Sequence, residues 1–132
     1  MTPYLFVYGT LMSSATAALG QAQRARLLRE GRSLGPATAA GRLYDFGRYP
    51  GLAESSGAGD IVHGEVYVLN DAAKSLPWLD AYEDIAPDRP GQYVRVERSV
   101  RLATGETLTA WMYLLQRGAA HARRVPSGRW TK

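Results

Sequence analysis

Apolar and polar residues alternate along several stretches of the chain, which is the pattern of a strand with one buried face. The alternation is clearest in residues 92–102 and 106–115, and the Ala103-Thr104-Gly105 segment between them suits a hairpin turn. A short apolar run near the N-terminus is typical of a buried strand. The strands predicted in this way are 4–8, 37–46, 61–69, 92–102 and 106–115.

A first helix is predicted over residues 13–30, where alanines and leucines recur at helical spacing and form a narrow apolar face. Ser13 or Ser14 is a candidate for its N-cap, and Gly31 is placed to end it. The arginines of this segment fall off the apolar face, so we expect them to be solvated.

A second helix is predicted over residues 71–84, with Asn70 or Asp71 as its cap. Pro77 lies inside this segment, and we expect it to break or kink the helix because proline lacks a backbone N–H.

Segments rich in Gly, Pro and Ser predict loops at 47–60 and 85–91, and the tail from residue 116 reads as irregular with Trp130 as an anchor. The resulting order of strands and helices is not a βαβ repeat. It predicts an α+β fold: a small, mixed, mostly antiparallel sheet, barrel-like, with flanking helices. The length fits one domain over residues 1–132.

Composition narrows the function classes. The net charge is +4 and nearly all basic residues are arginines, but they are scattered, which favours a solvated surface over binding of nucleic acid. An arginine-mediated binder of nucleic acid remains an alternative. The chain has no cysteine, which excludes disulfides, thiolate nucleophiles and Cys-based zinc sites. No apolar run long enough for a membrane span and no signal-peptide pattern is present, so a cytoplasmic location is expected.

The sequence lacks the usual motifs of metal sites and of serine hydrolases. His63 and His121 do not stand at metal-binding spacing, and no G-x-S-x-G occurs. We therefore expect no dedicated metal site.

The turn that follows the first predicted strand is a first candidate site. Tyr8, Gly9, Thr10 and Leu11 connect this strand to the first predicted helix, and such a turn exposes several backbone N–H groups. Unpartnered N–H groups favour an anion or a developing oxyanion. Gly9 permits a positive φ or a close approach of another group. An ordinary turn without a ligand explains the pattern equally well.

The segment WLDAYED, residues 78–84, is a second candidate. On a helix, Leu79, Tyr82 and Glu83 share one face, and apolar neighbours raise the basicity of a carboxylate. Glu83 would then suit a general base, although a solvated surface carboxylate is the commoner role of glutamate. Asp80 and Asp84 are expected to point elsewhere, as solvated or capping groups.

Taken in order, the motifs VYGTL, YDFGRYPGL, GEVYVL, LDAYED and VPSGRW resemble the γ-glutamylcyclotransferase-like family, also called AIG2-like, over residues 4–130. The resemblance implies a barrel-like α+β fold, a Tyr8–Leu11 turn that holds the γ-glutamyl end of a substrate through main-chain amides, and Glu83 as acid/base. Tyr49 and Pro50 resemble the loop that lines the family's pocket. Asp84 departs from the pattern, which commonly has Gly at that position.

The family reaction is an intramolecular aminolysis, in which the α-amine of a γ-glutamyl group attacks its own γ-carbonyl and 5-oxoproline and a free amine are released. This reaction needs no cofactor, and its partner is a small γ-glutamyl molecule whose amine half stays open. Tyr93 and Arg95 share one face of the predicted strand 92–102, and Tyr113 and Trp111 share one face of the next strand. A tyrosine hydroxyl or the arginine could contact the substrate there, with Tyr113 as the main candidate and hairpin packing as the alternative. A non-enzymatic protein that binds small ligands on the same fold is the alternative function.

Overall fold

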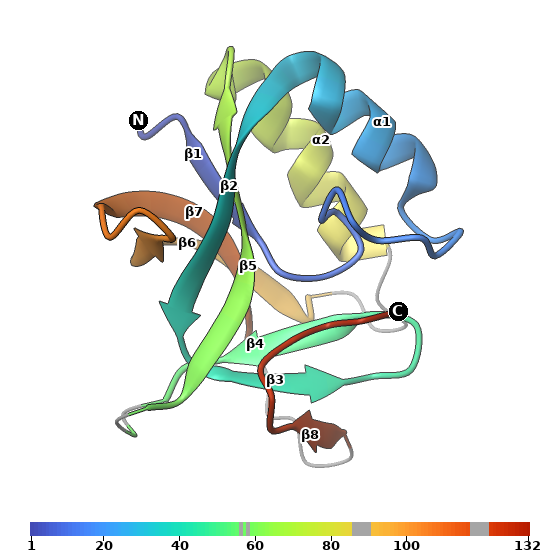
Figure 1. The fold of residues 1–132 in the computed structure, drawn as a ribbon. Helices are drawn as coiled ribbons and strands as arrows, with labels where there is room; N and C mark the ends of the chain where they lie inside the picture. Colours follow the sequence, from blue (N-terminus) through green and yellow to red (C-terminus); the bar gives the residue numbers. More distant parts are fainter. Residues whose placement is uncertain (56, 58, 86–90, 117–121) are drawn as a thin grey trace.

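The computed structural model describes residues 1–55, 57, 59–85, 91–116 and 122–132, with the backbone alone for 84 and 85. Most of the predicted loop 85–91, part of the predicted tail, and His121 lie outside these residues. The described elements, shown in Figure 1, are β1 (Tyr4–Val7), α1 (Gln21–Glu30), β2 (Gly31–Ala40), β3 (Arg42–Asp45), β4 (Pro50–Ala53), β5 (Ile61–Leu69), α2 (Ala72–Ile85), β6 (Tyr93–Leu102), β7 (Thr107–Leu115) and β8 (Arg123–Val125).

Five of the strands close into a small barrel. Antiparallel pairing joins β1 to β5, β5 to β2, β2 to β6 and β6 to β7, and a parallel pairing of Leu5 with Trp111 returns β7 to β1. Strands β4, β3 and β8 extend from β7 as an arm below the barrel, while both helices lie together on its other side (Figure 1). The predicted α+β fold with a mostly antiparallel, barrel-like sheet is confirmed.

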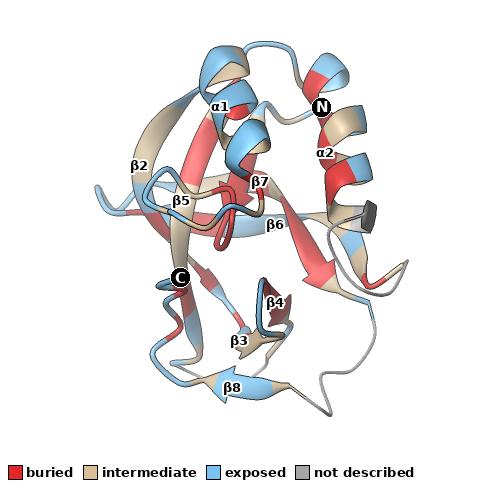
Figure 2. Cartoon of the chain, turned by 90° about the vertical axis from the view of Figure 1, so that its right-hand side faces the viewer, coloured by how far each residue is buried: buried red, intermediate tan, exposed pale blue. Residues whose placement is uncertain are grey.

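Successive side chains of β1 point alternately into two separate hydrophobic clusters. Phe6 and Tyr8 belong to a cluster of side chains within the barrel, whereas Leu5 and Val7 belong to a cluster shared with the helices. Burying a side chain such as Leu5 contributes about 1.5–3 kcal/mol. Figure 2 shows buried residues along β7 and on successive turns of α2, and largely exposed ones on β8. Trp130 is buried in the barrel cluster, which confirms its role as an anchor.

The first helix is shorter than predicted. It begins at Gln21, after Gly20 in a left-handed conformation with φ of 86°, and residues 13–20 form turns. Arg24, predicted to be solvated, instead donates hydrogen bonds to the carbonyls of Thr10 (2.7 Å), Ala17 (2.6 Å) and Leu19 (3.2 Å). These carbonyls would otherwise need helical partners, so one distant guanidinium stabilises the turns in place of a helix.

Several strand boundaries also differ from the prediction. The predicted strand 37–46 is broken at Gly41, whose φ is 152°, and β2 begins six residues before its predicted start. Strand β4 lies inside the predicted loop 47–60, and β8 inside the predicted irregular tail. Short segments rich in Gly and Pro carry a weak local strand signal, and pairing with distant strands decides their conformation.

Helix α2 continues through Pro77, so the predicted break there is wrong. A proline in a helix removes one hydrogen bond, and here the apolar contacts of Leu76 and Leu79 in the shared core offset that loss. Among the described residues no helix combines the length and apolar character needed to cross a membrane.

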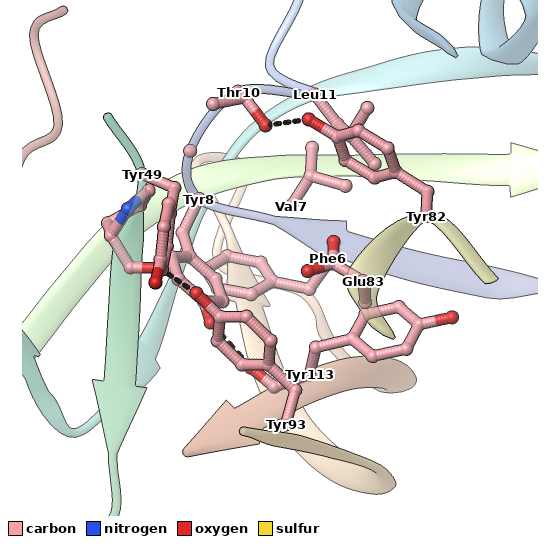
Figure 3. A pocket seen from close by; sticks show the side chains of 12 residues that line it. Phe6, Val7, Tyr8, Thr10, Leu11, Tyr49, Tyr82, Glu83, Tyr93 and Tyr113 are labelled. Atoms are coloured by element: carbon pink, nitrogen blue, oxygen red, sulfur yellow. Dashed lines mark hydrogen bonds between the residues drawn. The ribbon is translucent and has the colours of Figure 1, made fainter. Parts of the chain in front are cut away.

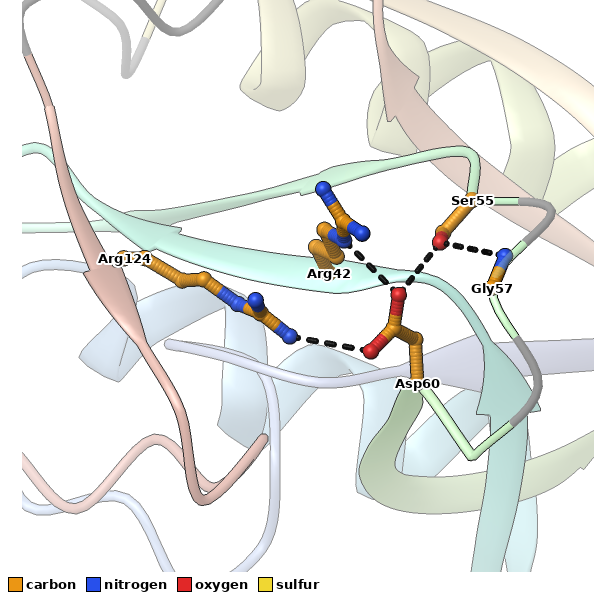
Figure 4. A network of polar contacts seen from close by, with 5 residues as sticks. All are labelled: Arg42, Ser55, Gly57, Asp60 and Arg124. Carbon is orange, nitrogen blue, oxygen red and sulfur yellow. Dashed lines mark hydrogen bonds and ion pairs between the residues drawn. The ribbon is translucent and has the colours of Figure 1, made fainter.

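An ion-pair network holds the arm to the barrel (Figure 4). The carboxylate of Asp60, just before β5, accepts hydrogen bonds from Ser55 (2.5 Å), Arg42 (2.7 Å) and Arg124 (3.0 Å). The hydrogen bond from Ser55 and the pairing with Arg42 lower the pKa of Asp60 to about 2. This carboxylate therefore stays ionised and links β3, β8 and the segment after β4.

The sheet forks at β7, because β1 and β4 both pair with the same edge of that strand. The hydroxyl of Tyr8 bridges the fork: it donates to the carbonyl of Tyr113 on β7 at 2.5 Å and accepts from the N–H of Leu52 on β4 at 3.3 Å. Pro50 packs so closely on Gly9 that a Cβ there would lie 2.5 Å from its Cγ. Gly9 has no positive φ, so close approach is what requires glycine at this turn.

We predict that Gly9→Ala lowers the free energy of unfolding by about 1–3 kcal/mol, because the added methyl overlaps the Pro50 ring. Pro50→Ala removes the overlapping Cγ and Cδ atoms, so Gly9→Ala should be milder in that background. Urea unfolding of the four proteins of this double-mutant cycle measures the coupling. An equal effect of Gly9→Ala in both backgrounds would contradict the assignment.

Candidate active site

A pocket lies at the fork of the sheet, between β1, the start of β4, β6, β7 and the last turn of α2 (Figure 3). It encloses about 430 Å³ of empty space, including its open mouth. All eight residues predicted for the site line it: Tyr8, Gly9, Thr10, Leu11, Tyr49, Pro50, Glu83 and Tyr113. The structure thus brings them together, while their roles stay predictions. Tyr93, a weaker candidate from the sequence, also lines the pocket. Phe6, Val7 and Tyr82 complete the lining and were not among the predicted site residues.

The turn after β1 is held by both helices. The Thr10 hydroxyl and the Tyr82 hydroxyl of α2 are 2.7 Å apart, and Arg24 of α1 donates to the Thr10 carbonyl (Figure 3 shows the first contact). Within the described part of the chain, the N–H groups of Gly9, Thr10 and Leu11 donate to no other group. They are available to an anion, although the predicted helix does not begin here and these are turn amides rather than a helix N-terminus.

The hydroxyl of Tyr8 links backbone groups of the strands around the pocket. Both hydrogen bonds of its hydroxyl go to backbone groups of β7 and β4. Burial raises the pKa of this hydroxyl well above its usual value, so it remains protonated and can donate. Tyr8 lines the pocket, and the two hydrogen bonds of its hydroxyl fix the position at which the turn begins.

Glu83 has the most perturbed carboxyl of the pocket. The fold places it one turn after Leu79, which is fully buried against the sheet. Burial, and to a smaller extent the negative charge of Asp80, raise the pKa of Glu83 from about 4.5 to about 8. Its carboxyl has no hydrogen bond or ion pair with any described residue. Near neutral pH both protonation states are populated, which suits a group that takes and returns a proton.

Tyrosines form the rest of the wall, and their hydroxyls are already engaged. Tyr93 donates to the carbonyl of Pro50, Tyr113 donates to Asp80 at 2.6 Å, and Tyr49 donates to Gln92 at 3.1 Å. Burial raises the pKa of both Tyr93 and Tyr113, so these phenols stay neutral. Among the described residues, the lining thus places rings and neutral hydroxyls around the Glu83 carboxyl.

Asp80, expected to be a solvated or capping group, has a side chain that is 44% exposed, but its carboxylate also has specific partners. Its carboxylate accepts from Nε of Arg95 at 2.8 Å, from Nη2 of the same residue at 3.3 Å, and from the Tyr113 hydroxyl. Asp80 stands three residues before Glu83, the spacing that puts two side chains on neighbouring positions of one helix face. This spacing is the feature of the sequence that could have indicated that Asp80 lies near Glu83. The side chain of Asp84 lies outside the described residues.

Metal ligands are not grouped in the site. Across the part of the chain that the structure describes, no three His, Asp or Glu side chains are placed to hold a metal ion. His63 lies on β5, outside the lining of the pocket.

The raised pKa of Glu83 predicts a pH dependence of stability. Because the folded pKa exceeds the unfolded one, the folded protein binds more protons between about pH 4.5 and pH 8, and stability falls as pH rises through that window. Each pKa unit corresponds to about 1.4 kcal/mol. In urea unfolding at a series of pH values, Glu83→Gln should lack this loss, so it gains stability relative to the native protein toward alkaline pH. Parallel curves for the two proteins would rule the shift out.

Comparison with known proteins adds to this geometry. The chain is 36% identical over 89 residues to the gamma-glutamylcyclotransferase family protein YtfP of Escherichia coli K12, an alignment that covers 67% of this chain and 66% of that protein. The solution structure of the Escherichia coli ytfP protein matches with a TM-score of 0.63 at 28% identity, covering 98% of this chain and 96% of the other. An AIG2-like protein from Mus musculus matches with a TM-score of 0.71 at 21% identity, over 98% and 95% of the two chains, which shows a shared fold.

The match to a family model is more extensive than the alignment to YtfP. The model described as gamma-glutamyl cyclotransferase, AIG2-like, matches residues 5–132, which includes the turn after β1, Glu83 and the buried Trp130. The chain belongs to the γ-glutamyl cyclotransferase, AIG2-like family.

Proposed function

We propose that the protein is a γ-glutamyl cyclotransferase, which converts a γ-glutamyl amide or amino acid to 5-oxoproline and a free amine. The observation that carries the proposal is one pocket that holds both the Glu83 carboxyl, whose pKa is raised to about 8, and the amides of Gly9, Thr10 and Leu11. Neither the carboxyl nor these amides have a hydrogen-bond partner among the described residues. Family membership supports the reaction class.

The reaction uses a nucleophile that belongs to the substrate. Its α-nitrogen attacks its own γ-carbonyl carbon, so the protein's task is to hold the folded-back conformation, which is a proximity effect. Glu83 accepts a proton from the α-ammonium and later gives one to the departing nitrogen as the carbon–nitrogen bond breaks. No protein nucleophile is consumed, and protons balance over the cycle.

The turn amides supply the complementary charge. N–H groups at Gly9–Leu11 stabilise the oxyanion that develops on the γ-carbonyl or bind the α-carboxylate of the substrate. The grip of Arg24 and Tyr82 on Thr10 holds these donors in place before the substrate arrives. The tyrosine rings exclude water, which strengthens such contacts.

The test is release of 5-oxoproline from a panel of γ-glutamyl amino acids and amines. We expect Glu83→Gln to keep the fold and to lose about 10²–10⁴-fold in turnover. Glu97→Gln, which removes an exposed carboxylate from β6, is the matched control and should remain active. A Glu83→Gln protein of near-native rate would refute the assignment of the base. Binding of panel members without turnover by the native protein would favour the ligand-binding alternative.

A second prediction concerns pH. The acidic limb of kcat/KM should have its midpoint near pH 8, because only ionised Glu83 accepts a proton. Asp80→Asn removes a negative charge that raises the pKa of Glu83, so the midpoint should move to lower pH. Asp71→Asn, at the start of the same helix, should leave it unchanged. An unshifted limb in Asp80→Asn would show that Asp80 does not tune the base.

A further inference from the structure

A second hollow adjoins the pocket on its outer side. It is lined by Asp80, Glu83, Tyr93, Val94, Arg95 and Tyr113, and it encloses about 560 Å³ of empty space with its open mouth. Glu83, Tyr93 and Tyr113 line both hollows, so the Glu83 carboxyl lies between them.

This arrangement separates the two halves of a γ-glutamyl substrate. The turn amides line the inner pocket alone, so the γ-glutamyl half belongs there. The departing nitrogen must stay within reach of Glu83, and the group attached to it then extends into the outer hollow. This assignment of the two substrate halves rests on the proposed function.

Arg95 is the cation of the outer hollow, and it is held rigidly. Its guanidinium lies 4.3 Å from the centre of the Trp111 ring, and its Nε and Nη2 donate to Asp80. A guanidinium has five N–H donors, and Asp80 takes two of them. The remaining donors have no acceptor among the described residues. The side chain is 26% exposed, so an incoming group can reach it.

The charges of the outer hollow favour an anion next to Arg95. Asp80 and Arg95 compensate each other, and the pKa of Glu83 near 8 leaves its carboxyl mostly neutral at pH 7. The described residues that line the hollow thus carry little net charge, and they offer guanidinium donors that have no described acceptor. Charge-assisted pairing with a carboxylate is the strongest contact that these donors make.

We propose that the outer hollow holds the departing amine, and that Arg95 determines specificity by favouring amines with a carboxylate on the carbon next to the nitrogen. The substrate class is then γ-glutamyl α-amino acids rather than γ-glutamyl derivatives of simple alkylamines.

The experiment compares γ-glutamyl-L-alanine with γ-glutamylethylamide, which differ only by that carboxylate. Arg95→Gln should lower kcat/KM for the alanine compound about 10–100-fold more than for the ethylamide, the loss expected for a hydrogen-bonded ion pair. Arg95→Lys, which keeps the charge but not the planar fork, should lose less. Arg101→Gln, an exposed arginine on the same strand, is the control and should leave the ratio unchanged.

The ratio between the two compounds is the readout, since any general disturbance of Asp80, Glu83 or the fold affects both. Equal losses for the two compounds, or no loss, would overturn the proposal. Thermal unfolding of each variant identifies those that fail to fold, and Arg95→Lys serves if Arg95→Gln is one of them.

A failure of the proposed function can be distinguished from a failure of the Arg95 assignment. If the native protein releases 5-oxoproline from neither compound, the proposed reaction fails for both. Calorimetric affinities for the same pair, measured in Glu83→Gln with and without Arg95→Gln, then test Arg95 by itself. A preference for the alanine compound that disappears with Arg95→Gln supports the assignment of the carboxylate contact. The absence of such a preference overturns it.

Discussion

The hydroxyl of Tyr8 is the contact on which the site depends. One edge of β7 is shared by β1 and β4, and where the two strands separate, backbone groups of both β4 and β7 need partners. The Tyr8 hydroxyl serves both, by donating to the carbonyl of Tyr113 and accepting from the N–H of Leu52. A buried backbone group without a partner costs about 1–3 kcal/mol, so this side chain keeps the fork open without that loss.

The open fork creates the chemical environment of the pocket. The chain turns directly after Tyr8, Gly9 receives the ring of Pro50, and the helices fix Thr10 from the other side. Glu83 reaches the same space from the end of α2, which the shared apolar core holds against the barrel. Desolvation of its carboxyl therefore follows from the same packing that positions the turn amides.

The packing around Glu83 disfavours the charged form of its carboxyl, which has no hydrogen-bond partner among the residues that the structure describes. The neighbouring Asp80 adds to that effect. Arg95 and Tyr113 both donate hydrogen bonds to Asp80 beside Glu83. The network thus preserves a repulsive contact that a protein selected for stability alone would lack, as is common at functional sites.

The sequence by itself determined the parts of the protein that rest on local patterns. A short apolar run predicted β1, and alternation predicted β5, β6 and β7. Helical spacing placed Glu83 beside the buried Leu79 and Tyr82. The motifs around Gly9 and Glu83 also indicated the family, and both motifs line the pocket.

Tertiary structure decided what depends on partners distant in the chain. Strand β4 and the first half of β2 form because other strands pair with them. The pairing of Asp80 with Arg95 likewise joins α2 to a neighbouring strand. Local periodicity carries no record of such contacts, since their free energy arises only when the fold brings the two groups together.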